Sequence, residues 1–243
     1  MRQTVPVSAP SPEQPRGLLI ADPSGRLGDS PVVDLTLPAV LLRSGALGHP
    51  EVVHVYRPRV PTVAFSARDL RSPGIVEATR LARVAGFVAV TRSPGGRMVA
   101  YDAGAVVIDH VTATGGFDQA GSATFAANAQ AHVGVLRSLG PADVRVGEVD
   151  GEYCPGEFSI NVAGTAKVVG SAQRVTARAA LFSTVVQVEM SAAVREVIER
   201  VSAALGYPLR TSSIAGLADV VPDLTVAEVA DAFRADYRAR LGL

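Results

Sequence analysis

The sequence predicts an α+β domain built on a central mixed β-sheet with flanking helices. Three observations indicate this class. Short β-type runs alternate with helical patterns, the apolar period changes from 2 to 3.6 after Met190, and no internal repeat interrupts the order. With 243 residues, 48% of them hydrophobic, the chain is long enough to bury a substantial core.

The first part of the chain is expected to combine strands with two helices. Residues 1–30 begin with a Pro/Ser-rich stretch and predict a flexible N-terminal segment. Apolar stripes at helical spacing predict helices over 34–47 and 74–84. Short β-branched runs predict strands over 52–56, 62–65, 86–90, 98–101 and 105–111.

The second part continues this alternation and then becomes helical. An Ala-rich helix is expected over 117–139, followed by strands over 144–149, 158–162 and 181–190. Near the end, Ser191 is predicted to cap one helix, and Thr225 with Glu228 forms a capping box for another. The expected organisation is the segment 1–30, a main domain 31–190, and a helical segment 191–243 packed on the same core.

Composition excludes several classes of function. Acidic and basic residues number 23 each, and this balance argues against nucleic acid or an anionic membrane as a partner. The single cysteine, Cys154, excludes an intramolecular disulfide and predicts a reducing, cytoplasmic location. The four histidines are not spaced as metal ligands, so no metal site is expected. No apolar run approaches the roughly 20 residues of a membrane span.

The candidate chemistry is concentrated in residues 152–175. Cys154 lies in a Tyr-Cys-Pro-Gly turn, and Lys167 lies on the strand that returns after the Gly164 turn. A thiol becomes a good nucleophile when a nearby cation stabilises the thiolate, and an ammonium aimed at an acyl carbonyl stabilises the charge that develops on attack. The alternatives are that Cys154 is a small buried apolar residue and that Lys167 extends to solvent.

A second candidate segment is the loop Arg92-Ser93-Pro94-Gly95-Gly96-Arg97 between two predicted strands. Its glycines allow backbone N–H groups to approach a ligand closely, and its arginines suit a carboxylate or phosphate. The alternative is an ordinary hairpin turn with solvated arginines. It is not a phosphate-binding P-loop, because the Gly-Lys-Ser/Thr ending and the following helix are missing.

Together these segments resemble motifs of the lipoate/octanoate protein ligase and acyltransferase superfamily, which is related in fold to biotin protein ligases. Residues 92–104 look like its Arg-x-x-Gly-Gly-Arg/Gly loop and the strand after it, and residues 167–174 look like its Lys-x-x-Gly-x-Ala/Ser-Gln-Arg motif. Residues 152–159 are similar to the Ser-Tyr-Cys-Pro-Gly-x-Tyr-Asp segment of the octanoyl-[glycine cleavage H protein]:protein octanoyltransferases. The resemblance covers roughly residues 35–190 and implies that the main domain is a catalytic domain of the biotin/lipoate ligase type.

The resemblance also implies site residues. Cys154 would carry the acyl group as a thioester, and Lys167 would contact the carboxyl end of that group. The implied substrate-binding residues are Arg92, Gly95, Gly96, Arg97, Tyr101, Gly156, Gly170, Ser171, Ala172 and Gln173.

The implied reaction moves an octanoyl or lipoyl group to a lysine of a lipoyl carrier domain, such as the glycine cleavage H protein or the E2 subunit of a 2-oxoacid dehydrogenase, without a cofactor. One alternative is an ATP-dependent lipoate–protein ligase, which uses ATP and Mg²⁺ to form a lipoyl-adenylate. Another is a non-catalytic acyl-binding protein. The ligases' His-Gly-Thr-Leu-Leu run is absent, since residues 179–184 read Ala-Ala-Leu-Phe-Ser-Thr, and this departure disfavours the ligase.

Overall fold

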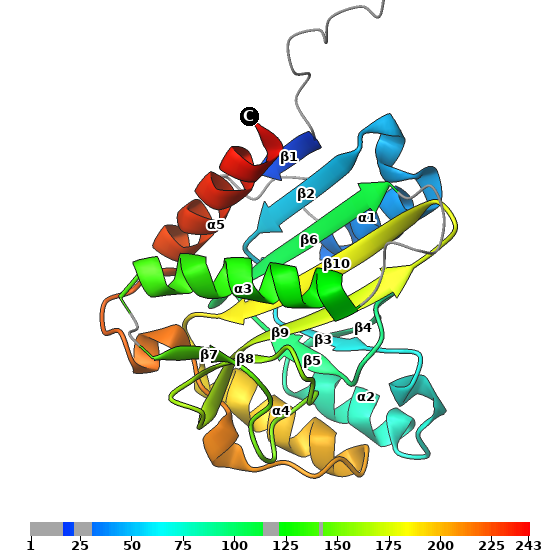
Figure 1. Cartoon of the computed structure of the whole chain (residues 1–243). Coiled ribbons are helices and arrows are strands. Elements are labelled where there is room, and N and C mark those ends of the chain that lie inside the picture. Colours follow the sequence, from blue (N-terminus) through cyan, green and yellow to red (C-terminus); the bar gives the residue numbers. More distant parts are fainter. Residues whose placement is uncertain (1–16, 22–30, 114–121, 141–142) are drawn as a thin grey trace, which may run out of the picture.

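A computed structural model describes residues 17–21, 31–113, 122–140 and 143–243. The described chain forms two mixed β-sheets with helices packed around them (Figure 1). This architecture agrees with the predicted α+β class, but the strands divide between two sheets where the sequence predicted one.

The larger sheet has seven strands in the order β1-β2-β6-β10-β9-β8-β7. β1 and β2 are parallel, and every other neighbouring pair is antiparallel. The strand bounds in chain order are Gly17–Ala21 (β1), Glu51–Tyr56 (β2), Ala105–Ala113 (β6), Val144–Val146 (β7), Ile160–Val162 (β8), Ala166–Val175 (β9) and Ala179–Gln187 (β10).

β1 lies inside the segment that was expected to be flexible. Its short apolar sequence, Gly-Leu-Leu-Ile-Ala, pairs along its full length with β2. The sequence prediction missed this strand because the Pro/Ser-rich composition around it is typical of flexible segments. The remaining residues of 1–30, and residues 117–121 of the predicted Ala-rich helix, lie outside the described part of the chain.

The smaller sheet has the order β4-β3-β5, with β3 parallel to β4 and antiparallel to β5. Its strands are Thr62–Phe65 (β3), Val88–Thr91 (β4) and Val99–Tyr101 (β5). The loop over residues 92–97 joins β4 to β5. We call it the Gly-Gly loop, after Gly95 and Gly96. It contacts the larger sheet, because the Gly95 N–H donates to the Gln173 carbonyl.

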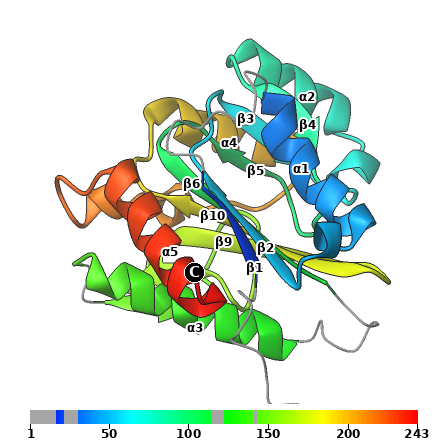
Figure 2. The ribbon, with the colours of Figure 1, turned by 90° about the horizontal axis from the view of Figure 1, so that it is seen from above.

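In the described part of the chain, five α-helices cover the two sheets (Figure 2). α3 and α5 pack on one face of the larger sheet, while α1 and the smaller sheet lie on the other face. α2 and α4 contact each other and cover the outer side of the smaller sheet. The helices are Pro31–Ser44 (α1), Ile75–Val84 (α2), Ser122–Ser138 (α3), Ala192–Ala204 (α4) and Val226–Leu241 (α5).

The predicted helix caps are present in the C-terminal part. The Ser191 side chain accepts a hydrogen bond from the N–H of Val194 at the start of α4. Thr225 and Glu228 form the predicted capping box at the start of α5. Each cap satisfies a backbone N–H that has no partner within its helix. No helix in the described part of the chain is long and apolar enough to span a membrane.

Two predicted strands are shorter than expected, because residues 147–159 form a loop between β7 and β8. Gly147, Gly151 and Cys154 in this loop have positive φ angles of 150°, 71° and 48°. In this loop a side-chain hydrogen bond takes the place of backbone pairing between strands, because the Asn161 amide donates to the Gly147 carbonyl at 2.9 Å. The short β8 leaves part of β9 open, and the candidate site occupies this opening.

Candidate active site

The site lies at an open edge of the larger sheet. β8 pairs with β9 only between Ala166 and Val169, so the rest of β9 has β10 on one side and no strand of the described chain on the other. The Gly-Gly loop from the smaller sheet reaches this edge, where the Gly95 N–H donates to the Gln173 carbonyl at 3.5 Å. The two predicted segments, distant in sequence, are therefore neighbours.

Cys154 lies directly against the Gly-Gly loop. Its sulfur accepts a hydrogen bond from the Arg97 N–H, with an N–Sγ distance of 3.2 Å. The Arg92 guanidinium also points at the sulfur, with Nη2 at 3.9 Å. Cys154 is only partly buried, so the thiol remains accessible. An amide donor and a guanidinium group therefore lie beside a partly exposed sulfur.

Arg92 also holds the loop in shape. Its Nη2 donates to the carbonyl oxygens of Gly95 at 2.6 Å and Arg97 at 2.7 Å. Gly96 has φ +89°, and a Cβ at this position would lie 3.0 Å from both Cys154 Sγ and Arg92 Nη2. Glycine is therefore required at position 96 by the backbone conformation and by the close approach of the sulfur.

Lys167 is almost completely buried, with 1% of its surface exposed, and it faces the backbone of the cysteine turn. Its Nζ donates to the carbonyl of Cys154 at 2.7 Å, to the carbonyl of Tyr153 at 3.2 Å and to Glu152 Oε1 at 3.2 Å. An ammonium has three donors, and these three acceptors occupy all of them. In this structure Lys167 thus supports the left-handed turn at Cys154 instead of facing its sulfur.

Glu152, which the sequence analysis did not select, organises the rest of the turn. Its Oε1 accepts from Gly156 N–H at 3.1 Å and from Ser159 Oγ at 2.6 Å, while Oε2 accepts from Val149 N–H at 3.0 Å. The side chain is buried and neutralises Lys167. A buried charge needs a partner, so a lone lysine on a packed strand was the available signal that a nearby acid would join it.

An open cavity adjoins the sulfur. Phe125 of α3 and Phe158 form an aromatic wall, with ring centroids 5.5 Å apart. The predicted site residues that line this thiol cavity are Cys154, Gly95, Gly96, Gly156, Ser171, Ala172 and Gln173.

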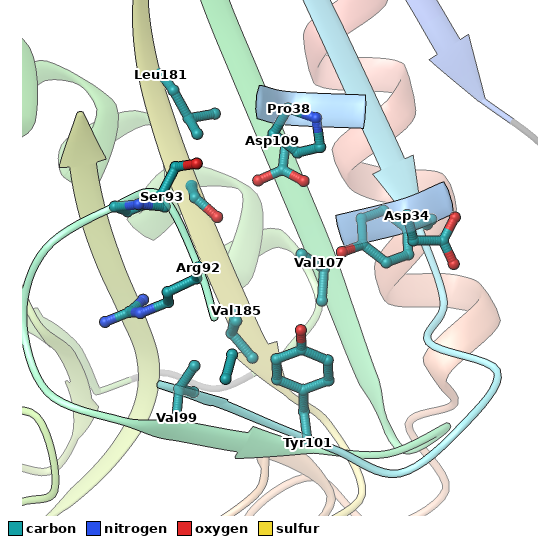
Figure 3. Close-up of a pocket in the computed structure, with 14 residues that line it drawn as sticks. Asp34, Pro38, Arg92, Ser93, Val99, Tyr101, Val107, Asp109, Leu181 and Val185 are labelled. Carbon is teal, nitrogen blue, oxygen red and sulfur yellow. The ribbon is translucent and has the colours of Figure 1, made fainter. Parts of the chain in front are cut away.

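The other predicted residues have different positions. The Arg97 guanidinium lies over the Tyr207 ring, 4.6 Å from its centroid, so only the backbone of Arg97 faces the thiol. Gly170 leaves room for Lys167, since a Cβ there would lie 3.1 Å from Lys167 Cε. Tyr101 lines a second cavity, together with Arg92 (Figure 3).

The second cavity contains a buried carboxyl group. Burial raises the pKa of Asp109 to about 7, although a hydrogen bond from Ser183 opposes this shift and Asp34 adds to it. Burial also raises the pKa of Tyr101 well above its ordinary value. Figure 3 shows the Asp109 carboxyl and the Tyr101 hydroxyl pointing into the same space, while the Arg92 guanidinium points away from Asp109.

The fold and the arrangement of the two motifs define an α+β domain of the biotin/lipoate ligase type. Residues 31–238 match the family model of the lipoyl protein ligase A/B catalytic domain, and the chain belongs to this family.

Two relatives match by sequence. An octanoyl-[GcvH]:protein N-octanoyltransferase of Geobacillus kaustophilus is 33% identical over 117 residues, which cover 46% of this chain and 39% of that protein. A protein of the same name from Exiguobacterium sibiricum is 29% identical over 116 residues, covering 46% and 40%. The matched region thus spans about two fifths of the length of each relative.

Solved structures show the same fold. Lipoate-protein ligase A bound with ATP superimposes with a TM-score of 0.71 at 22% identity, covering 95% of this chain and 86% of that chain. A putative lipoate protein ligase from T. acidophilum with bound lipoic acid gives 0.69 at 22% identity, covering 95% and 87%.

Proposed function

We propose that this protein is an acyltransferase that moves an octanoyl or lipoyl group to a lysine of a lipoyl carrier domain through a thioester on Cys154. The observation that carries the proposal is the position of the sulfur, which faces an open cavity and lies 3.2 Å from the Arg97 N–H and 3.9 Å from Arg92 Nη2. The names of the two sequence relatives, both octanoyl-[GcvH]:protein N-octanoyltransferases, support the transfer of an octanoyl group.

In the first half-reaction, the Cys154 thiolate attacks the carbonyl carbon of the acyl group on the donor lysine. An S–C bond forms and the C–N bond of the donor amide breaks, so the donor lysine leaves as an amine and takes up a proton. Negative charge moves from the sulfur to the carbonyl oxygen during the attack. The Arg97 N–H and the Arg92 guanidinium are the nearest donors to stabilise it.

In the second half-reaction, the amine of the acceptor lysine attacks the thioester. A new amide forms, the S–C bond breaks, the amine gives up a proton, and the Cys154 thiolate is regenerated. The overall change is one amide for another, so protons balance and the proposal requires no ATP or Mg²⁺. Lys167 and Glu152 act as positioning residues, since they hold the backbone of the turn that presents the sulfur.

The proposed partners are therefore an acylated donor and an acceptor that both display a lysine on a lipoyl carrier domain. The glycine cleavage H protein is the proposed donor, and E2 subunits of 2-oxoacid dehydrogenases are the proposed acceptors. A reducing compartment such as the cytoplasm would keep the Cys154 thiol free for this reaction.

The test is intact mass spectrometry of the protein mixed with octanoylated H protein in the absence of ATP. The expected result is an added octanoyl mass on the wild-type chain that is absent from Cys154→Ala. Adding an unmodified E2 lipoyl domain should then remove the adduct and acylate that domain.

A parallel sample contains free lipoate, ATP, Mg²⁺ and the lipoyl domain. If the domain is acylated only in this sample, and Cys154→Ala still acylates it, the protein is an ATP-dependent ligase. Acyl binding without transfer in either sample would instead indicate a non-catalytic acyl-binding protein.

A further inference from the structure

Three successive carbonyl groups of the Gly-Gly loop each accept a hydrogen bond from a side chain. Arg92 Nη2 donates to the first and the third, which are the carbonyls of Gly95 and Arg97. The middle carbonyl, that of Gly96, accepts from Ser66 Oγ at 2.7 Å. Ser66 follows β3 directly, so the middle group is held by a residue from outside the loop.

The Gly96 carbonyl belongs to the same peptide group as the Arg97 N–H, which donates to the sulfur of Cys154. A peptide group is planar, and in its trans form the carbonyl and the N–H point in opposite directions. The hydrogen bond from Ser66 therefore fixes one end of a group whose other end lies 3.2 Å from Cys154 Sγ.

Glycine at position 96 makes this anchor necessary. Gly96 has φ +89°, and glycine adopts positive and negative φ with similar ease. The loop backbone alone therefore does not decide whether the Arg97 N–H faces the sulfur or turns away from it. The Ser66 hydroxyl favours the first orientation, because there the Gly96 carbonyl meets its donor.

The direction of the Ser66 hydroxyl is itself fixed. A hydroxyl has one proton and two acceptor sites. The acceptor sites face two backbone donors, the N–H of Arg68 at 3.2 Å and that of Asp69 at 3.4 Å. The proton is therefore left for the Gly96 carbonyl. Ser66 is completely buried, so water does not compete for this proton.

Asp69 and Tyr207 hold Ser66 in place. The Ser66 N–H donates to Asp69 Oδ2 at 2.7 Å, and the Tyr207 hydroxyl donates to Asp69 Oδ1 at 2.6 Å. Burial raises the pKa of Tyr207 to about 12, and Asp69 adds to this shift, so the hydroxyl keeps its proton near neutral pH. The Tyr207 ring also lies under the Arg97 guanidinium. Both the backbone and the side chain of Arg97 are thus fixed.

We propose that Ser66 is a positioning residue, which aims the Arg97 N–H at the carbonyl oxygen of the acyl group that Cys154 attacks. Asp69 and Tyr207 hold it in that position. The oxygen is bonded to the carbon that the sulfur attacks, so a donor in contact with the sulfur also reaches the oxygen. The proposal rests on the acyltransferase function proposed above, and it assigns the residue that sets the direction of one of the two donors.

Two reactions of the same thiol separate positioning from general damage to the site. In the first, the N-acetylcysteamine thioester of octanoic acid acylates Cys154: an S–C bond forms to the octanoyl carbon, and N-acetylcysteamine leaves as a thiol that carries the proton. Negative charge develops on the carbonyl oxygen during this reaction. In the second, iodoacetamide alkylates the thiol, and no such charge develops.

The saturating rate of Cys154 acylation, followed by intact mass, should fall at least about tenfold in Ser66→Ala. The thioester concentration at half-saturation should change little, because the N–H acts in the transition state. The rate of alkylation should stay within about threefold of the wild type, since it needs no donor for an oxygen. Circular dichroism confirms that each variant is folded before the rates are measured.

Ser72→Ala is the matched control. The Ser72 hydroxyl, like that of Ser66, accepts from the backbone N–H two residues ahead, that of Gly74 at 3.2 Å, and it donates to a carbonyl, that of Leu205 at 3.5 Å. This carbonyl lies at the end of α4 and not in the Gly-Gly loop. Both rates in Ser72→Ala should therefore equal those of the wild type.

Tyr207→Phe tests the same network if Ser66→Ala does not fold. The variant keeps the ring under the Arg97 guanidinium and removes only the hydroxyl that donates to Asp69. Loss of this hydrogen bond should lower the rate of acylation about threefold and leave the rate of alkylation unchanged. Equal effects on the two reactions in this variant would overturn the proposal.

Hydrogen exchange of the Arg97 amide separates failure of this proposal from failure of the proposed function. The amide is observed by NMR in protein that contains isotope-labelled arginine, and its signal is assigned by its absence from Arg97→Lys. Exchange should accelerate about threefold or more in Ser66→Ala and stay unchanged in Ser72→Ala.

The outcomes of these measurements are distinct. If Ser66→Ala is acylated at the wild-type rate, or if acylation and alkylation slow equally, Ser66 does not aim the donor, while the thioester function stands. If exchange accelerates but the wild type is acylated by neither the thioester nor octanoylated H protein, the orientation of the peptide group by Ser66 stands and the transferase function fails. An unchanged rate of exchange in Ser66→Ala overturns the proposal.

Discussion

The ammonium of Lys167 lies 2.7 Å from the carbonyl oxygen of Cys154, and its remaining donors are directed at Glu152 and Tyr153. The lysine therefore stabilises the shape of the cysteine turn and neutralises a buried acid. This relationship predicts that Lys167 contributes strongly to stability as well as to acyl transfer.

Removing one member of the Lys167–Glu152 pair leaves a buried charge without its partner, which costs about 3–5 kcal/mol of unfolding free energy. Lys167→Met and Glu152→Gln should each lower the melting temperature by roughly 10 °C for a chain of this size. The double variant should be more stable than the sum of the single changes predicts, because no unpaired charge remains. Urea unfolding of the four proteins measures this coupling.

Glu77→Gln provides the control for this experiment, because Glu77 forms an exposed ion pair with Arg80. This change should leave the unfolding midpoint unaltered. The rate of Cys154 alkylation by iodoacetamide reports the positioning role. It should change in both single variants of the buried pair and stay constant in Glu77→Gln. Strictly additive stabilities would contradict the coupled role of Lys167 and Glu152.

Gly96 predicts a defect that affects the thiol specifically. An alanine Cβ at position 96 would lie 3.0 Å from the sulfur of Cys154, and φ is +89°. Gly96→Ala should therefore lower the rate of Cys154 acylation at least tenfold, together with a loss of about 1 kcal/mol of stability from the left-handed backbone.

Gly86→Ala is the matched control for Gly96→Ala. Gly86 has a similar φ of +83°, but nothing lies within 4 Å of the position that an added Cβ would occupy. This variant should lose a similar amount of stability and keep the wild-type rate of acylation. Equal acylation rates in the two variants would show that crowding at the sulfur has no effect on the reaction.

The elements of the site were predictable from local sequence, but their arrangement was not. The spacing of the Lys167 motif and the Tyr-Cys-Pro-Gly turn is a local property, and so is the Gly95-Gly96 loop. That the loop comes from a separate sheet and meets β9 at its open edge depends on long-range strand pairing, which periodicity does not encode. For the same reason, the contact of Lys167 with the carbonyl of Cys154 required the structure.

The burial of Glu152 and Asp109 also could not be predicted from the local sequence. Both lie in regions whose secondary structure was partly predicted, and an acidic residue in such regions is usually exposed. Glu152 is buried because the loop 147–159 folds its backbone N–H groups around the carboxylate. Asp109 faces a cavity because the register with Ser183 turns it toward the smaller sheet.

Asp109 predicts a pH-dependent contribution to stability. Burial raises the pKa of Asp109 to about 7 in the folded protein, from an ordinary value of 3.8. The folded state thus holds a proton that the unfolded state releases between these values, so the contribution is favourable below pH 4 and is lost as the pH rises to 7. Asp109→Asn removes this dependence, and its stability relative to the wild type should rise by up to about 4 kcal/mol between pH 4 and pH 8.

Urea unfolding of wild type and Asp109→Asn at half-unit pH intervals checks this expectation. The difference between the two curves should appear between pH 4 and 7 and remain constant above pH 7. Parallel stability curves across the whole range would mean that Asp109 titrates as an ordinary exposed carboxyl.

His132 predicts a pH dependence of stability with the opposite sign to that of Asp109. Burial, with smaller contributions from Arg240 and His110, lowers the pKa of His132 to about 3, and its ring donates to or accepts from the Tyr237 hydroxyl at 3.0 Å. The unfolded chain binds a proton at this residue near pH 6.5, whereas the folded chain does not. Its stabilising effect is therefore complete above pH 6.5 and is lost as the pH falls toward 3.

His132→Gln keeps a hydrogen-bonding group near Tyr237 and removes the titration. The variant should be less stable than the wild type at pH 7 because the ring also packs against Phe233, with centroids 5.1 Å apart. This deficit should shrink by about 3 kcal/mol between pH 7 and pH 4, because only the wild type must keep a neutral imidazole at low pH. Thermal and urea unfolding at the two pH values measure the change. A deficit that is the same at both would show that His132 takes up a proton in the folded protein and that α3 and α5 admit the charge between them.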